Sequence, residues 1–150
     1  MAWPTDDELA DLIARFHAVT IPAPEFTHAA HLVVGLWHAA TFDETEALTR
    51  MRAGIYRLND FHGTPNTDTR GYHETITRAY LILLAQFARA RPGVTVASVA
   101  QSLLASGLAK RDALMNFYSK ELLMSVGARR EWVEPDLRPL DASSVCPSPP

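Results

Sequence analysis

The 150-residue sequence has almost no cysteine, no long apolar run and no excess of basic charge. Its single cysteine, Cys146, excludes an intrachain disulfide and a cysteine metal cluster, and it favours a reducing, cytoplasmic setting. No apolar stretch approaches the roughly 20 residues that span a bilayer, and the acidic start at residues 6–8 is unlike a signal peptide, so we expect no membrane partner. Its 14 basic and 17 acidic side chains are mixed along the chain, which argues against a nucleic-acid partner.

The hydrophobic content and the spacing of apolar residues predict an all-α protein. With 47% hydrophobic residues the chain can bury a core, and its length suits one domain. Apolar residues recur at three- and four-residue steps, and no segment shows convincing strand alternation. We therefore expect a single-domain bundle of about six helices. Their expected ranges are 5–20, 27–41, 43–62, 72–91, 95–106 and 111–125.

The C-terminus is rich in proline. Five of the ten prolines follow Val133. Since proline removes a backbone donor and interrupts helices, we expect the helical domain to cover residues 1–140 and a disordered tail to cover residues 141–150.

The second expected helix is unusual because residues 26–42 contain no Asp, Glu, Lys or Arg. A helix that is apolar all round is normally buried all round. Its ionisable side chains are three histidines, and Thr27 is the expected N-cap. His28 and His31 are three residues apart, so they project from neighbouring turns of one face and can reach one ion. His38 lies two turns beyond His31, and we interpret it as a core residue.

A fourth histidine stands at the expected start of the fourth helix, after the polar loop 63–71. His73 shares a helix face with Tyr80, which favours a supporting role for this phenol at the same site. The simplest interpretation of Glu74 is an ion pair with Arg78, four residues on. The alternative is a carboxylate ligand, a general base or a group that orients an imidazole. The pattern is not that of a His-Glu-x-x-His protease, because Thr77 replaces the second histidine.

If the N-termini of the second and fourth helices meet, His28, His31 and His73 converge. Three imidazoles with an open position form the first shell of a catalytic zinc site, and copper and iron also accept this ligand type. The sequence therefore predicts a divalent transition metal on these three histidines, with Glu74 and Tyr80 as catalytic groups.

The last two histidines have simpler interpretations. His62 precedes Gly63 at an expected helix end, where an imidazole favours the negative end of the helix dipole. His17 follows Phe16 near another helix end and is expected at the surface or partly packed.

Three segments of the chain resemble a family of small, uncharacterised, all-helical bacterial proteins. The resemblance covers residues 26–140 and names no activity. It implies a common site around His28, His31 and His73. The segments are Phe26-Thr27-His28-x-x-His31-Leu32, Gly71-Tyr72-His73-Glu74-Thr75-Ile76-Thr77 and Trp132-Val133-Glu134-Pro135-Asp136-Leu137-Arg138-Pro139-Leu140.

These patterns lead to three functional hypotheses. The first is a small metalloenzyme that acts on a small organic molecule entering past the 63–71 loop. The second is a metal-free enzyme whose histidines and Glu74 perform acid/base chemistry in an apolar cavity. The third is a non-enzymatic module that binds a small ligand or a metal, including a homodimer formed through apolar helix faces.

Overall fold

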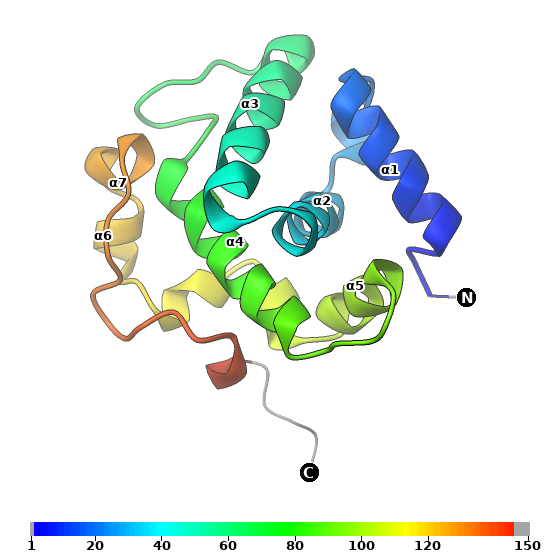
Figure 1. The fold of residues 1–150 in the computed structure, drawn as a ribbon. Helices are drawn as coiled ribbons and strands as arrows, with labels where there is room; N and C mark the ends of the chain where they lie inside the picture. Colours follow the sequence, from blue (N-terminus) through cyan, green and yellow to red (C-terminus); the bar gives the residue numbers. More distant parts are fainter. Residues whose placement is uncertain (1, 146–150) are drawn as a thin grey trace.

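The computed structural model describes residues 2–145, and every regular element among them is a helix (Figure 1). The predicted all-α fold class is confirmed. No helix in this part of the chain is both long and apolar enough to cross a membrane. The longer helices are α1 (Asp6–Ala18), α2 (His28–Thr41), α3 (Glu44–His62), α4 (Glu74–Arg89) and α5 (Val96–Leu104).

The central element of the fold is α2. Figure 1 shows it end-on, with α1, α3, α4 and α5 around it, and it packs against all four. Residues 32–36 are buried, as expected for a helix with no charged side chain to place in solvent. The Thr27 side chain accepts the backbone N–H of Ala30, so His28 is the first helical residue, as predicted.

Both ends of α3 also lie where the sequence places them. Asp43 accepts the backbone N–H of Glu46 and caps the N-terminus. Gly63 ends the helix in the left-handed conformation at φ +71°, which a residue without Cβ adopts at little cost. Helix α4 begins at Glu74, two residues later than predicted, because His73 is its N-cap.

The single helix predicted over residues 111–125 is wrong. That region instead holds short helices, because serine side chains there cap new helix starts. Ser119 accepts the backbone N–H of Leu122, and Ser125 accepts that of Ala128. The elements of this half are the 3₁₀ turns η2 (Gly107–Ala109) and η3 (Ala113–Asn116), followed by α6 (Lys120–Leu123) and α7 (Val126–Arg130).

The proline-rich segment after α7 is an ordered strap that packs against α4 and ends in η4 (Ala142–Ser144). The amide of Gln86 donates to the Leu140 carbonyl and accepts the backbone N–H of Ala142, whose side chain is buried. These two hydrogen bonds attach residues 140 and 142 to α4, and the predicted disorder of the 141–150 tail stays a prediction. Residues 146–150 of the predicted tail lie outside the described residues.

α1 and α3 approach closely where the ring of Phe16 lies against Gly54. A Cβ at position 54 would collide with this ring, which is only 2% exposed and so is enclosed by the core. We expect Gly54→Ala to lower the free energy of unfolding by about 2 kcal/mol. Overpacking costs up to about 3 kcal/mol, and the better helix propensity of alanine returns about 1 kcal/mol. Urea denaturation measures the difference.

The matched control for this substitution is Gly127→Ala in α7, where a Cβ meets no atom within 4 Å. Here only the helix propensity changes, so stability should stay constant or rise by up to about 1 kcal/mol. Equal effects at the two glycines would mean that the contact between Phe16 and Gly54 does not limit packing.

Candidate functional site

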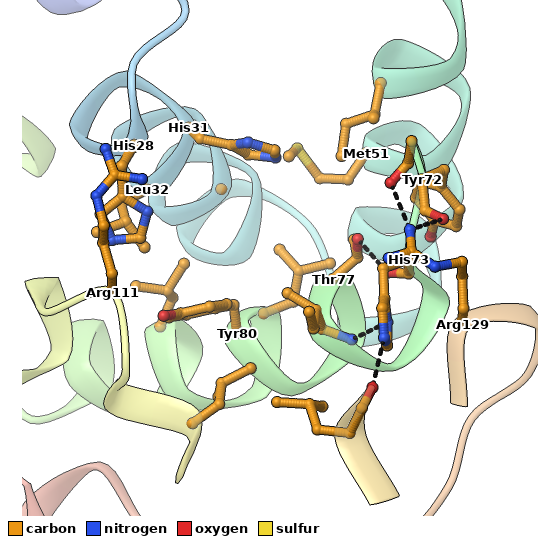
Figure 2. A pocket seen from close by; sticks show the side chains of 18 of the residues that line it. His28, His31, Leu32, Met51, Tyr72, His73, Thr77, Tyr80, Arg111 and Arg129 are labelled. Atoms are coloured by element: carbon orange, nitrogen blue, oxygen red, sulfur yellow. Dashed lines mark hydrogen bonds between the residues drawn. The ribbon is translucent and has the colours of Figure 1, made fainter. Parts of the chain in front are cut away.

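A pocket of about 410 Å³ opens between α2, α3, α4 and the 111–124 segment. Its wall includes His28, His31, His73 and Tyr80 (Figure 2), whereas Glu74 is not part of it. Most of the wall is apolar, with side chains such as Leu32, Ile55, Ile76, Leu81, Leu84 and Leu114. An apolar cavity with a few polar groups is the usual form of a small-molecule site.

His28 lies at one end of the pocket, the end at which Figure 2 also draws Tyr80 and Arg111. Its Nε2 donates to the carbonyl of Ala109 at 3.0 Å, because a carbonyl oxygen can only accept. Nδ1 is therefore left as an acceptor. The His28 and Tyr80 rings meet edge to face with centroids 6.5 Å apart.

His31 faces the pocket from the next turn of α2, and solvent reaches its ring. Within the described residues no hydrogen bond engages either ring nitrogen, whereas His28, His38, His62 and His73 each bond a carbonyl. Desolvation by the pocket wall lowers the pKa of His31 below its ordinary value, and repulsion from His28 acts in the same direction. At pH 7 the pocket thus presents a neutral imidazole with one free donor and one free acceptor.

Tyr80 lines the same end of the pocket from α4. Its hydroxyl oxygen is buried and lacks a hydrogen-bonding partner within the described residues. Burial, helped by the nearby carboxylate of Asp112, raises the pKa of Tyr80 to about 12, so the hydroxyl keeps its proton. Because the oxygen is covered, contact with a ligand requires a small movement of Tyr80 or of its neighbours.

His73 lies at the opposite end of the pocket from His28 (Figure 2). Its Nδ1 accepts the backbone N–H of Ile76 at 3.1 Å, and its Nε2 donates to the carbonyl of Leu123 at 2.8 Å. Burial lowers the pKa of His73 and Arg129 adds to this effect, while the bond to Leu123 opposes it. Both ring nitrogens therefore serve the structure: one caps α4 and the other anchors the end of α6.

This geometry does not fit a three-histidine metal centre. A first-shell imidazole needs a free ring nitrogen, and His73 has none. In the described part of the chain, no group of three or more His, Cys, Asp or Glu side chains is arranged to hold a metal ion. Metal ligation by His28, His31 and His73 stays a prediction; the structure brings these side chains to one pocket but not into one cluster.

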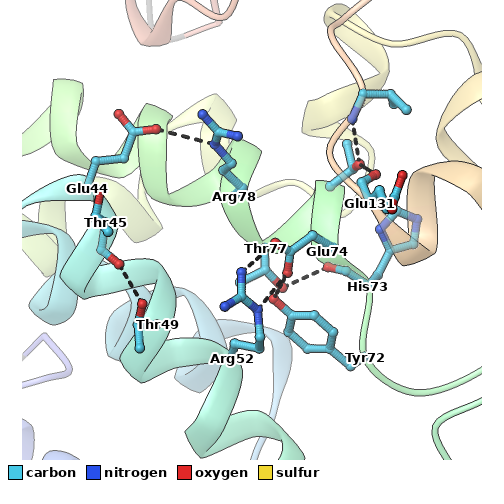
Figure 3. A network of polar contacts seen from close by, with 12 residues as sticks. Glu44, Thr45, Thr49, Arg52, Tyr72, His73, Glu74, Thr77, Arg78 and Glu131 are labelled. Carbon is cyan, nitrogen blue, oxygen red and sulfur yellow. Dashed lines mark hydrogen bonds and ion pairs between the residues drawn. The ribbon is translucent and has the colours of Figure 1, made fainter.

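Glu74 belongs to a polar network beside the pocket (Figure 3). Arg52 of α3 donates to its two oxygens at 3.0 and 2.6 Å, and the hydroxyl of Tyr72 donates at 2.6 Å. Burial alone would raise the pKa of Glu74, but the bonds from Arg52 and Tyr72 outweigh it, so this pKa is lowered. The carboxylate is ionised and engaged, and it joins α4 to α3.

The predicted ion pair between Glu74 and Arg78 is wrong. Arg78 instead donates to Glu44 at the start of α3, at 3.4 Å. Glu74 pairs with Arg52 of α3 because the guanidinium donates to both carboxylate oxygens. Such a two-bond ion pair is stronger than a single exposed ion pair along one helix.

The three remaining histidines lie outside the pocket. His38 is fully buried, as predicted, and its Nδ1 donates to the carbonyl of Val34 at 2.8 Å. His62 is the last residue of α3, also as predicted, and its Nε2 donates to the carbonyl of Ile21. His17 is exposed and lies edge to face with Trp37.

Sequence reasoning missed two groups of pocket residues. Arg111 and Asp112 precede η3, where the prediction had only the start of a helix. The second group is Met51, Met115 and Met124, which are all the methionines of the chain except Met1. Helical periodicity treats these methionines as ordinary core residues, so the sequence carries no signal that they meet in one pocket.

Comparisons with known protein families, with curated proteins and with solved structures find no match to this chain.

Proposed function

We propose that this protein binds a small, largely apolar organic molecule in the pocket between α2 and α4, with His31 as the central hydrogen-bonding group. The observation that carries the proposal is the free, solvent-accessible imidazole of His31 in a wall that is otherwise mainly apolar. A neutral imidazole can donate to one ligand atom and accept from another.

The lowered pKa of His31 favours ligand recognition over acid/base catalysis. A general base works best when its pKa lies near the pH at which it acts, and desolvation moves the pKa of His31 away from neutral pH. Glu74, the other expected proton carrier, is held by Arg52 and Tyr72 outside the pocket. A non-enzymatic binding module therefore accounts for these groups better than an enzyme.

Octan-1-ol is a suitable first probe because it combines an apolar chain with one hydroxyl. We expect it to shift the methyl NMR signals of Met51, Met115 and Met124 as it fills the pocket. His31→Leu keeps a side chain of similar size but removes both ring nitrogens. It should weaken binding by about twofold to tenfold, the effect of one lost hydrogen bond.

A second variant tests the location of the probe. Ile76 is a partly buried wall residue, and Ile76→Trp should fill the pocket and abolish the methyl shifts. The controls are His17→Leu and Leu137→Trp, at exposed positions outside the pocket wall. Unchanged binding in Ile76→Trp, or equal loss in the controls, would contradict the proposal.

A further inference from the structure

The pocket wall carries three charged side chains, Arg111, Arg129 and Asp112. Arg129 is engaged, because its Nη1 donates to the backbone carbonyls of Gly71 and Tyr72 at 2.9 and 3.3 Å. Arg111 is exposed, lies at the His28 end of the pocket, and makes no hydrogen bond to the residues drawn around it in Figure 2. The wall therefore has a net positive charge, and Arg111 is the cation that remains available to a ligand.

The apolar part of the wall is adaptable. Met51 comes from α3, Met115 comes from η3, and Met124 directly follows α6. Methionine has three rotatable bonds and a polarisable sulfur, so such a wall accommodates flexible chains better than it selects one rigid shape. All three side chains line the pocket.

We propose that the pocket binds an alkyl monocarboxylate, with the carboxylate at Arg111 and the chain against the methionine-lined wall. The inference rests on the proposed function and adds the chemical class of the ligand. A guanidinium presents parallel N–H donors that match the two oxygens of a carboxylate. His31 and Tyr80 line the same pocket, which keeps polar groups near its apolar wall.

The negative charge of Asp112 should act on carboxylate binding in the opposite direction to the positive charge of Arg111. Its carboxylate is exposed, follows Arg111 in the chain and lies near enough to Tyr80 to raise the pKa of that phenol. It therefore opposes an anion at this end of the pocket. Removing the negative charge should strengthen carboxylate binding, whereas removing the positive charge of Arg111 should weaken it.

The experiment compares sodium octanoate with octan-1-ol, two probes of equal chain length that differ in charge. By calorimetry we expect Arg111→Gln to weaken octanoate binding about tenfold, the usual loss of a charge-assisted hydrogen bond, and to leave octan-1-ol within about twofold. Asp112→Asn should strengthen octanoate binding by about twofold to fivefold, as expected for a solvent-screened like charge. Arg138→Gln, at an exposed position outside the pocket wall, is the matched control.

The length of the alkyl chain of the ligand tests whether this chain lies against the methionine-lined wall. Octanoate should bind about tenfold more tightly than hexanoate, because each buried CH₂ contributes about threefold to fourfold in affinity. Equal affinities for octanoate and hexanoate would mean that the alkyl chain does not contact the apolar wall, and would overturn the inference.

Failure of this inference differs from failure of the proposed function. If octan-1-ol binds but octanoate is no tighter, or is insensitive to Arg111→Gln, the ligand class is wrong and the binding function stands. If neither probe shifts the methionine methyl signals, the proposed function itself is overturned, and this inference with it.

Discussion

His73→Ala should lower the free energy of unfolding by about 2–4 kcal/mol. The substitution removes the N-cap of α4, which is worth about 0.5–2 kcal/mol, and leaves the Leu123 carbonyl without its partner, at about 1–3 kcal/mol. The side chain is 6% exposed, so water does not easily replace the ring. Urea denaturation monitored by circular dichroism measures the change.

Two comparisons separate this structural role from the predicted metal role. Asparagine is a favoured N-cap, so His73→Asn should keep the bond to the Ile76 N–H, lose only the contact with Leu123, and recover about half of the lost stability. The deficit of His73→Ala should also be the same with and without a chelator. If chelation lowers wild-type stability to that of the variant, His73 acts through a metal and the structural assignment is wrong.

The behaviour of His73 shows where sequence reasoning reached its limit. Serine, threonine, aspartate and asparagine are the usual N-caps, so the sequence predicts that a histidine before Glu74 lies within the helix. The position of the ring depends on the Leu123 carbonyl, 50 residues further along the chain. Local patterns contain no information about such a partner.

Glu74 was misassigned for the same reason. Spacing along one helix correctly identifies Arg78 as a neighbour, but spacing cannot show that α3 presents Arg52 at a shorter distance. By contrast, α2 and α3 were predictable, because their signals are local. Uncharged residues predicted the burial of the middle of α2, although His31 and the C-terminal end of the helix are exposed, while Asp43 and Gly63 marked the two ends of α3.

The candidate site was predictable in part. His28 and His31 were correctly expected on one helix face, and the structure places both in one pocket with Tyr80. Arg111 was not predictable, because it reaches the pocket through the turns between α5 and α6, whose path depends on packing against α4.

The stability of the protein should fall by about 2 kcal/mol between pH 7 and pH 5 through His38 alone. Burial lowers the pKa of this residue to about 4 in the folded state, with His17 and Arg50 adding repulsion and the bond to Val34 opposing the shift. The unfolded chain takes up a proton near the ordinary pKa of about 6.5. Between these two values the unfolded state binds more protons than the folded state, so acid destabilises the fold.

The environment of His38 explains why the folded state resists this proton. Its Nε2 is buried and has no partner within the described residues, and the rings of Phe16, His17, Trp37 and Phe42 surround the imidazole. Protonation would place a charge among these rings with no acceptor for the new N–H. The side chain therefore contributes stability fully above pH 6.5 and loses it as the pH falls towards 4.

His38→Leu isolates this contribution. The Val34 carbonyl keeps its ordinary helical hydrogen bond, so the variant should fold, and the unsatisfied nitrogen disappears. Urea denaturation at pH 7, 6 and 5 should show a stability loss about 2 kcal/mol smaller for the variant than for the wild type. NMR titration of the His38 ring gives an independent measurement, with Nε2 expected to stay unprotonated at pH 5. A ring that titrates near pH 6.5, together with equal pH dependence in the two proteins, would show that burial does not control this histidine.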